Sequence, residues 1–382
     1  MRYIKLSALL LISAVLFTLL PSGDVHAADN VEITSPSAVL MDAATGTVLF
    51  EKAPHEKRAC ASITKVMTLT LVMEAIEGGK IKWDDTVTTS EHAASMGGSD
   101  IWLEPGETMS VRDMVKAAVI ASANDAAVAL AELVSGSEDN FVAAMNKKAA
   151  SLGMKDTTFK NCNGLDEEGH LSSAYDVALM SRELIKHKDI LNFTTTRIDS
   201  LRNGKTQLVN TNRLLINYKG ITGLKTGTTS KAGSCISATA EREGLSLISV
   251  VLGASDTKTR FKEAAQLLDY GFAVYTMYTP GIPEKALSDI SVKNGISEAV
   301  KPQVTNRMPI LIKKGEEKNI KCELSLPQEV EAPVERGQKL GSIIYKNGSN
   351  SICEYAVTAS ETVRRITLPD ILLLLIRALA GA

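Results

Sequence analysis

The sequence predicts an α+β protein in which an antiparallel sheet flanked by helices is followed by a small all-β domain and a short apolar C-terminal helix. Three observations support this fold class. Up to about residue 275, apolar residues recur either at helical spacing or in strand-like runs. Beyond Pro280-Gly281-Ile282-Pro283, short alternating segments are separated by Gly, Pro and Asn. The chain then ends in an almost wholly apolar stretch after Asp370.

The N-terminal end, residues 1–27, has the pattern of a secretory signal peptide. Arg2 and Lys5 precede an apolar run over residues 6–20, and Val25-His26-Ala27 offers small residues for cleavage before Ala28. An uncleaved membrane anchor is the alternative, although the run is short for a membrane span. Export excludes nucleic acid and cytosolic nucleotides as ordinary substrates.

The elements of the first domain, residues 28–283, follow in order. Residues 36–51 read as a hairpin that turns at 42–46, and a helix starts at Ser62 and closes at Gly78-Gly79. Helical stretches over 109–121 and 125–134 meet at Ser122-Ala123-Asn124, since Ser and Asn suit such a break. The remaining predictions are helices over 138–152, 173–186 and 257–275, and strands over 225–231, 233–241 and 245–253.

Two further segments follow. Residues 284–365 predict a small β-sandwich, and residues 366–382 a membrane-surface anchor. A dozen apolar residues cannot cross a bilayer, but a short helix that carries Arg377 can lie in its surface. A last helix packed on the β domain is the alternative.

The composition of the chain limits the partners, metals and cofactors that we expect it to bind. The 382 residues carry a net charge of −2, so no polyanion partner is implied. The histidines share no His-x-x-x-His spacing, so we expect no metal site, and no glycine-rich phosphate loop indicates a nucleotide cofactor. The five cysteines form no Cys-x-x-Cys pair, which favours buried thiols and leaves a bridge between Cys322 and Cys353 open.

Three short strings carry the functional signal: Ser62-Ile63-Thr64-Lys65, Ser122-Ala123-Asn124 and Lys225-Thr226-Gly227. Each alone is weak, because a Ser followed three places later by Lys should arise roughly twice by chance in such a chain. In this order and at this spacing, they match the Ser-x-x-Lys, Ser-x-Asn, Lys-Thr-Gly set of class A β-lactamases and penicillin-binding proteins.

The residue types fit acyl transfer. Lys65, one helical turn after Ser62, places an amine beside a hydroxyl, and burial together with the charge of Lys225 would lower its pKa. Ser122 can pass a proton to a leaving nitrogen, and Asn124 can fix Lys65. Lys225 and Thr226 on a strand edge offer a cation and a hydroxyl to a carboxylate. Gly227 would let a ligand approach the strand closely.

With these motifs placed, the chain resembles the low-molecular-weight penicillin-binding proteins of the D-alanyl-D-alanine carboxypeptidase family, which are serine DD-peptidases. The resemblance extends to residues 54–68, 161–175 and 222–233 and covers nearly the whole chain. It implies a β-lactamase/DD-peptidase-like catalytic domain in residues 28–283. It also implies a location at the outer face of the cytoplasmic membrane or in the cell-wall space, with no cofactor.

The resemblance also implies residue roles. Ser62 would be the acylated nucleophile, Lys65 its general base, and Ser122 with Asn124 the proton relay. The terminal carboxylate would be held by Lys225 and Thr226 with the help of Arg260, and the backbone N–H groups of Ser62 and Thr228 would form the oxyanion hole. For His170 a structural role in its loop is favoured.

The implied reaction removes the last D-alanine from the peptidoglycan stem pentapeptide, and β-lactams would acylate the same serine. Two alternatives remain at this stage. A class A β-lactamase needs a glutamate-bearing loop, but residues 155–170 contain no Glu-x-x-Leu-Asn string. A non-catalytic wall-binding scaffold would be favoured by loss of a motif residue, but every motif residue is present.

Overall fold

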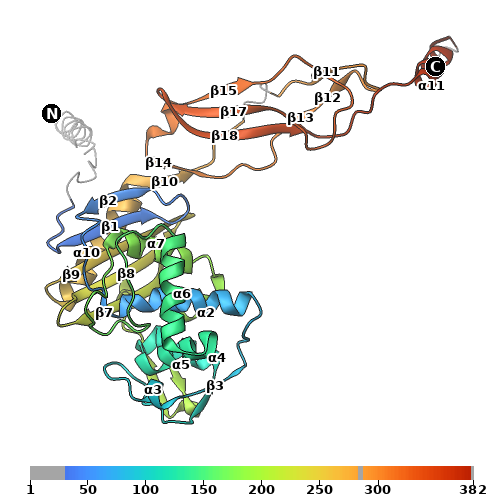
Figure 1. Ribbon diagram of the computed structural model, residues 1–382. Coiled ribbons are helices and arrows are strands. Elements are labelled where there is room, and N and C mark those ends of the chain that lie inside the picture. Colours follow the sequence, from blue (N-terminus) through green and yellow to red (C-terminus); the bar gives the residue numbers. More distant parts are fainter. Residues whose placement is uncertain (1–30, 283–286, 380–382) are drawn as a thin grey trace, which may run out of the picture.

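The computed structural model describes residues 31–282 and 287–379, so the predicted signal peptide lies outside the described residues. Figure 1 shows a helix-and-sheet part and, projecting from it, an elongated β part that ends in a short helix. This order agrees with the fold class that the sequence predicts.

A five-stranded sheet forms the centre of the first part, with strand order β2-β1-β9-β8-β7 and antiparallel pairing throughout. The predicted hairpin is confirmed, as are the three predicted strands. The bounds are β1 (Ser37–Asp42), β2 (Val48–Lys52), β7 (Ile221–Thr229), β8 (Gly233–Arg242) and β9 (Leu245–Ala254). Because β7 lies at one end of this order, one of its edges pairs with no other strand among the described residues.

Helices cover both faces of this sheet (Figure 1). On one face, α10 (Thr257–Val274) buries Leu267 and Leu268 against Leu247 of β9. On the other face, α2 (Lys65–Glu77) and α7 (Ala174–Leu184) share a larger core with the remaining helices. These are α4 (Val111–Lys116), α5 (Asn124–Ser135) and α6 (Glu138–Ser151).

Several short elements have no counterpart in the sequence predictions. The largest group lies between α2 and α4, where β3 (Thr86–Thr88) and β4 (Thr108–Ser110) enclose α3 (Glu91–Ala94). A second ribbon, β5 (Ile198–Leu201) and β6 (Thr206–Val209), follows α7. Runs of three or four residues are too short to show a period, which explains why they were missed.

The C-terminal part is all-β, as predicted. The ribbon of β10 (Tyr275–Tyr278) and β14 (Ile310–Lys313) joins it to α10, so the apolar run at 310–312 belongs to this ribbon rather than to a sandwich sheet. The other strands form one sheet in the order β12-β11-β16 and another in the order β13-β18-β17-β15. Their bounds are β11 (Ile290–Lys293), β12 (Ala299–Val300), β13 (Pro302–Gln303), β15 (Ile320–Ser325), β16 (Glu329–Glu331), β17 (Lys339–Asn347) and β18 (Asn350–Ala359).

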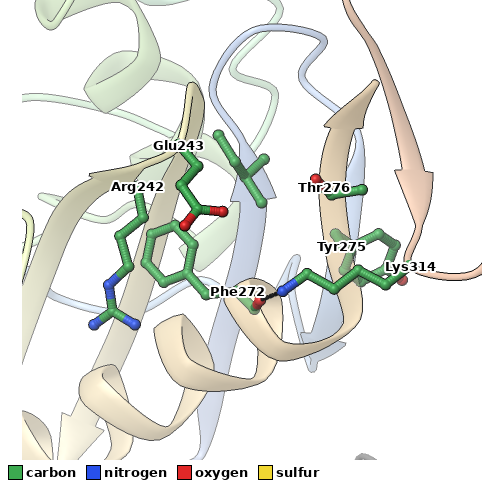
Figure 2. Close-up of a pocket in the computed structure, with 7 residues that line it drawn as sticks. Arg242, Glu243, Phe272, Tyr275, Thr276 and Lys314 are labelled. Carbon is green, nitrogen blue, oxygen red and sulfur yellow. Dashed lines mark hydrogen bonds between the residues drawn. The ribbon is translucent and has the colours of Figure 1, made fainter. Parts of the chain in front are cut away.

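A pocket of about 200 Å³ marks the joint between α10 and this ribbon (Figure 2). The Lys314 amine donates a 2.7 Å hydrogen bond to the Phe272 carbonyl, and the Lys314 N–H bonds the Val274 carbonyl. The last carbonyls of a helix lack partners within the helix and favour a cation. Lys314 therefore attaches β14 to the end of α10.

The structure rules out the bridge between Cys322 and Cys353. Cys322 pairs with Tyr345 on one side, and Tyr345 pairs with Cys353 on the other. Two strand spacings separate the cysteines by about 9.6 Å, whereas a disulfide needs Cα atoms within about 7 Å. All five cysteines are free thiols, and Cys60, Cys162 and Cys235 are buried as predicted.

The C-terminal helix α11 (Leu368–Leu379) does not pack on the β domain, so that alternative is wrong. Its apolar side chains are exposed at Leu368, at each position from Ile371 to Ile376, and at Leu379. Among the described residues, no helix combines the length and the apolar character that a membrane crossing requires.

Candidate active site

Ser62 and Lys65 are brought together by a tight helical turn. Ser62 lies in a 3₁₀ turn over Ala61–Thr64 that runs directly into α2, which begins at Lys65. The predicted helix start at Ser62 is therefore one turn of 3₁₀ geometry rather than α-helix. Ser62 is half-buried and Lys65 is fully buried, and the Lys65 Nζ donates to the Ser62 Oγ at 3.2 Å.

The Lys65 amine has two other partners, the Asn124 Oδ1 and, at 2.7 Å, the Asn163 carbonyl. Burial lowers the pKa of Lys65 to about 7. A neutral amine has two N–H groups and one lone pair, and both Asn oxygens can only accept. With its N–H groups on Asn124 and Asn163, neutral Lys65 directs the lone pair to Ser62.

Ser122 and Asn124 lie at the predicted joint between two helices, where a π turn over Ala117–Ala121 meets α5. Ser122 adopts the left-handed conformation, with φ 64° and ψ 28°, which is strained for a residue with a side chain. Asn124 is also fixed on its other side, because its Nδ2 donates to the Gly97 carbonyl at 2.6 Å.

Lys225 reaches across the site from β7. Its Nζ donates to the Ser122 Oγ at 2.8 Å and to the Thr226 carbonyl at 3.0 Å. Burial is the leading cause that lowers the pKa of Lys225 well below its ordinary value, followed by repulsion from Lys65 and Arg260. The sequence predicted that burial and the charge of Lys225 would both lower the pKa of Lys65. Burial is the leading cause, as predicted, whereas the repulsion between the two lysines lowers the pKa of Lys225.

Arg260, near the start of α10, fixes the β7 edge. Its Nη1 donates to the Gly227 carbonyl at 2.9 Å and to the Thr228 Oγ1 at 2.7 Å. The Thr226 hydroxyl donates to the Thr211 Oγ1 at 2.7 Å. The structure thus gathers every residue predicted from the motifs on two facing walls, the β7 edge and the helical wall of Ser62, Ser122 and Asn124.

Gly227 has a packing role that the sequence did not predict. A Cβ at this position would lie 2.8 Å from both the Cys60 carbonyl oxygen and the Ser62 nitrogen. The missing side chain therefore makes room for the chain's own serine-bearing turn, and the close approach of a ligand to this strand stays a prediction. The same contact places the Ser62 N–H next to β7, one residue from Thr228.

The loop over residues 161–170 contains site residues that sequence reasoning missed. Asn163 supplies a backbone carbonyl to Lys65, and a main-chain acceptor leaves no signature in residue type. Gly164 was a usable signal: its φ is +89°, and a Cβ there would lie 2.0 Å from the Ala61 carbonyl oxygen. Asp166 closes the loop on the end of β7, where it accepts a 2.7 Å hydrogen bond from the Thr229 hydroxyl.

His170 has a structural position in this loop. The Lys160 N–H donates to its Nδ1 at 3.1 Å, so the proton is on Nε2, which donates to the Thr64 Oγ1 at 2.8 Å. Burial lowers the pKa of His170 to about 4, so the ring is neutral at pH 7. His170 therefore secures the loop to the turn that carries Ser62 without bonding Ser62 itself. In the described ranges, no group of three His, Cys, Asp or Glu residues could hold a metal ion.

This fold and this site are those of a serine acyl-transfer enzyme, with a buried lysine rather than a histidine beside the serine. Residues 24–256 match the family model described as D-alanyl-D-alanine carboxypeptidase, and residues 275–365 match the penicillin-binding protein 5 C-terminal domain. The chain belongs to this carboxypeptidase family of serine hydrolases.

Similar proteins support the assignment over nearly the whole chain. The D-alanyl-D-alanine carboxypeptidase DacF of Bacillus subtilis is 44% identical over 94% of this chain and 95% of its own length. DacC of Escherichia coli is 36% identical over 92% of this chain and 90% of its own. The crystal structure of penicillin-binding protein 5 from Haemophilus influenzae superposes with a TM-score of 0.74 at 32% identity, covering 88% of this chain and 99% of that one.

Proposed function

We propose that Ser62 is the nucleophile of a D-alanyl-D-alanine carboxypeptidase that acts on peptidoglycan stem pentapeptides. The observation that carries this proposal is the buried Lys65 amine at 3.2 Å from the Ser62 hydroxyl, with a pKa lowered to about 7. Such an amine is partly neutral at physiological pH and can take a proton. Its other two hydrogen-bond partners, the Asn124 Oδ1 and the Asn163 carbonyl oxygen, can only accept.

In the acylation step, the Ser62 Oγ bonds the carbonyl carbon between the two D-alanines while its proton passes to Lys65. The backbone N–H groups of Ser62 and Thr228 stabilise the oxyanion, which their placement beside Gly227 supports. The C–N bond then breaks, and the leaving amine receives through Ser122 the proton that Lys65 took from Ser62, which leaves Lys65 neutral for deacylation. In deacylation, water attacks the ester, gives its proton to Lys65, and Ser62 recovers its own.

The β7 edge supplies the site for the terminal carboxylate. Lys225 and Thr226 offer a buried cation and a hydroxyl, and Arg260 acts through Thr228 and the Gly227 carbonyl, which it bonds directly. Because the Nη1 of Arg260 already bonds β7, we assign Arg260 a positioning role. Its charge attracts the substrate carboxylate from a distance, and Arg260 is not the first residue to contact that carboxylate. The open edge of β7 also allows the peptide to pair as an added strand.

β-Lactams would acylate Ser62 in the same way. Penicillin-binding protein D2 from Listeria monocytogenes, known in an ampicillin-bound form, superposes with a TM-score of 0.58 at 34% identity over 64% of this chain and 99% of that one. Among the described residues, the hydrogen-bond partners of Ser62 and Lys65 include no carboxylate. Rapid hydrolysis of penicillin by a glutamate-activated water, as in a class A β-lactamase, is therefore not favoured.

The test compares Ser62→Ala with the parent protein and with Ser151→Ala, which changes an exposed serine at the end of α6. Parent and Ser151→Ala should release D-alanine from a pentapeptide ending in D-Ala-D-Ala and bind fluorescent penicillin covalently. Ser62→Ala should do neither. If Ser62→Ala released D-alanine as fast as the parent, the mechanism would be refuted. If the parent were labelled by penicillin but released no D-alanine, the proposed substrate would be wrong.

We further propose that the protein is exported and that α11 lies in a membrane surface. Its leucines are exposed, and twelve residues extend only about 18 Å, too short to cross an apolar core of about 30 Å. Removing residues 366–382 should release the protein from the membrane fraction, as should Leu372→Glu with Leu375→Glu. Membrane retention by both variants would contradict the anchor.

A further inference from the structure

Trp102 is an exposed aromatic side chain held in an unusual backbone conformation. It is one of two tryptophans in the chain, and its side chain is 81% exposed. Its φ of 54° lies in the left-handed region, where a bulky residue is strained. The other tryptophan, Trp83, packs its ring 5.4 Å from that of Phe193, with Arg112 over its face. A strained residue that exposes a large ring calls for an explanation by function.

The backbone on either side of Trp102 is clamped by two charged side chains. The Asp125 Oδ2 accepts the N–H groups of Ile101 at 3.1 Å and Leu103 at 3.0 Å. The Arg202 guanidinium donates to the Ile101 carbonyl at 2.9 Å and to the Trp102 carbonyl at 3.3 Å. Ile101 and Leu103 are buried, so the clamp directs the side chain between them into solvent.

Arg202 is itself fixed by a second carboxylate. Its Nε and Nη2 bond the two carboxylate oxygens of Glu107 at 2.7 and 3.0 Å. Such a two-point contact fixes the plane of the guanidinium as well as its position. The exposed ring is therefore presented by a rigid support rather than by a loose loop.

The same loop is attached to the proposed active site through Asn124. The Asn124 N–H donates to the Ser99 carbonyl at 2.7 Å, and its Nδ2 bonds Gly97. Asp125, which clamps the loop, directly follows Asn124, whose Oδ1 binds Lys65. The support of Trp102 is thus continuous with the helical wall that faces β7.

We propose that Trp102 is a substrate-contact residue on which a sugar ring of the glycan strand that carries the stem peptide stacks. The proposal rests on the proposed function, which makes a peptide joined to a glycan the substrate. The C–H faces of a pyranose carry partial positive charge and match the negative face of an indole, while its polar edges suit a hydrophilic surround. The nearby exposed side chains Ser99 and Glu104 are polar, and both apolar neighbours of Trp102 are buried.

The position of the sugar in the substrate agrees with a contact outside the cleft. Each extended peptide residue spans about 3.3–3.6 Å, so a sugar several residues from the scissile bond lies about 10 Å or more from Ser62. An apolar peptide side chain would be better matched by a cluster of apolar groups than by one isolated ring. A single flat ring with polar side chains around it therefore favours a sugar over an apolar peptide side chain as the group that Trp102 contacts.

The experiment compares Trp102→Ala and Trp102→Phe with the parent on two substrates, a disaccharide pentapeptide and the same pentapeptide without sugar. For Trp102→Ala, we expect the ratio of the two kcat/KM values to fall about tenfold, through KM on the sugar-bearing substrate. Trp102→Phe, which keeps a flat ring, should keep most of the ratio. An unchanged ratio, or an equal loss on both substrates, would overturn the proposal.

A binding measurement separates this proposal from the proposed function. In Ser62→Ala, which cannot be acylated, the disaccharide pentapeptide should shift the tryptophan emission to shorter wavelength, and the added Trp102→Phe change should abolish the shift. If the shift occurs but the parent releases no D-alanine, the proposed reaction fails and the sugar contact stands. If D-alanine is released but no shift occurs, the sugar contact is refuted.

Discussion

The amine of Lys225 donates a 2.8 Å hydrogen bond to the hydroxyl of Ser122, across the space between β7 and the helical wall. The site therefore contains two lysine–serine pairs, since Lys65 contacts Ser62 in the same way. Both lysines are buried, and burial lowers the pKa of each. Because Lys225 donates to the Ser122 oxygen, the Ser122 hydroxyl proton points away from Lys225 and can be passed to a leaving group, while Lys65 serves the nucleophile.

Removing the Ser122 hydroxyl should separate its chemical role from its backbone strain. Ser122→Ala and Ser122→Gly both delete the hydroxyl, and we expect each to slow D-alanine release by about 10²–10⁴-fold, the usual contribution of a general acid. Glycine adopts the left-handed conformation without penalty, so Ser122→Gly should be more stable than Ser122→Ala by about 1 kcal/mol. Steady-state kinetics and urea unfolding measure the two effects. Full activity in Ser122→Gly would show that the residue acts through its conformation alone.

The acylation rate should rise with pH as Lys65 loses its proton. Its pKa of about 7 means that the amine is charged below that pH and neutral above it, and only the neutral form can accept the Ser62 proton. We expect kcat/KM to increase through pH 7 and then level off. Lys65→Arg should remain charged throughout and lose about 10²–10⁴-fold at every pH.

Lys147→Arg is the matched control for this substitution, because Lys147 is exposed on α6. It should keep both the rate and the pH profile of the parent. The rate of covalent labelling by penicillin between pH 5 and 9 provides the profile without the deacylation step. A profile without a rise near pH 7 would contradict the assignment of Lys65 as base.

Gly227→Ala should displace the serine-bearing turn. Its new methyl group would lie 2.8 Å from the Ser62 nitrogen and the Cys60 carbonyl oxygen, both of which are backbone atoms that cannot rotate away. We expect a loss of about 1–3 kcal/mol in the free energy of unfolding and a large loss of penicillin acylation. Gly281→Ala is the control, because among the described residues no atom other than those of Gly281 and its two chain neighbours lies within 4 Å of its Cβ position. If penicillin acylated both variants as fast as the parent, the packing of β7 on this turn would not be needed for the reactivity of Ser62.

Much of the fold could be read from the apolar pattern, because the long helices place apolar residues at helical spacing and the three consecutive strands are runs of mostly buried residues. The ribbons at 86–110 and 198–209 could not, since their three- and four-residue strands are fixed by tertiary contacts. Arg202 shows the difference: its bonds to Glu107 and Ile101 join segments about a hundred residues apart, and no local pattern reports such a contact.

The motif residues of the site were found because their side chains carry the chemistry. Asn163 was missed because only its carbonyl is used, and Trp102 because an exposed ring has no period to reveal it. Gly227 was identified for its access to a ligand, and its packing role was missed. Its neighbour is the turn at Ser62, which lies more than 160 positions away along the chain, a distance over which sequence alone gives no geometry.

His170 should make the first part of the protein sensitive to mild acid. Burial lowers its pKa from 6.5 to about 4, so the folded state binds fewer protons than the unfolded state between these pH values. The contribution of His170 to the free energy of unfolding should therefore be fully present above pH 6.5. The free energy of unfolding should fall by up to about 3 kcal/mol as the pH approaches 4. His170→Gln keeps a donor and an acceptor but cannot titrate, so its unfolding free energy should change less over this range. Both tryptophans precede residue 275, so urea unfolding followed by tryptophan fluorescence reports this part. Parallel losses in parent and variant would show that other groups cause the acid sensitivity.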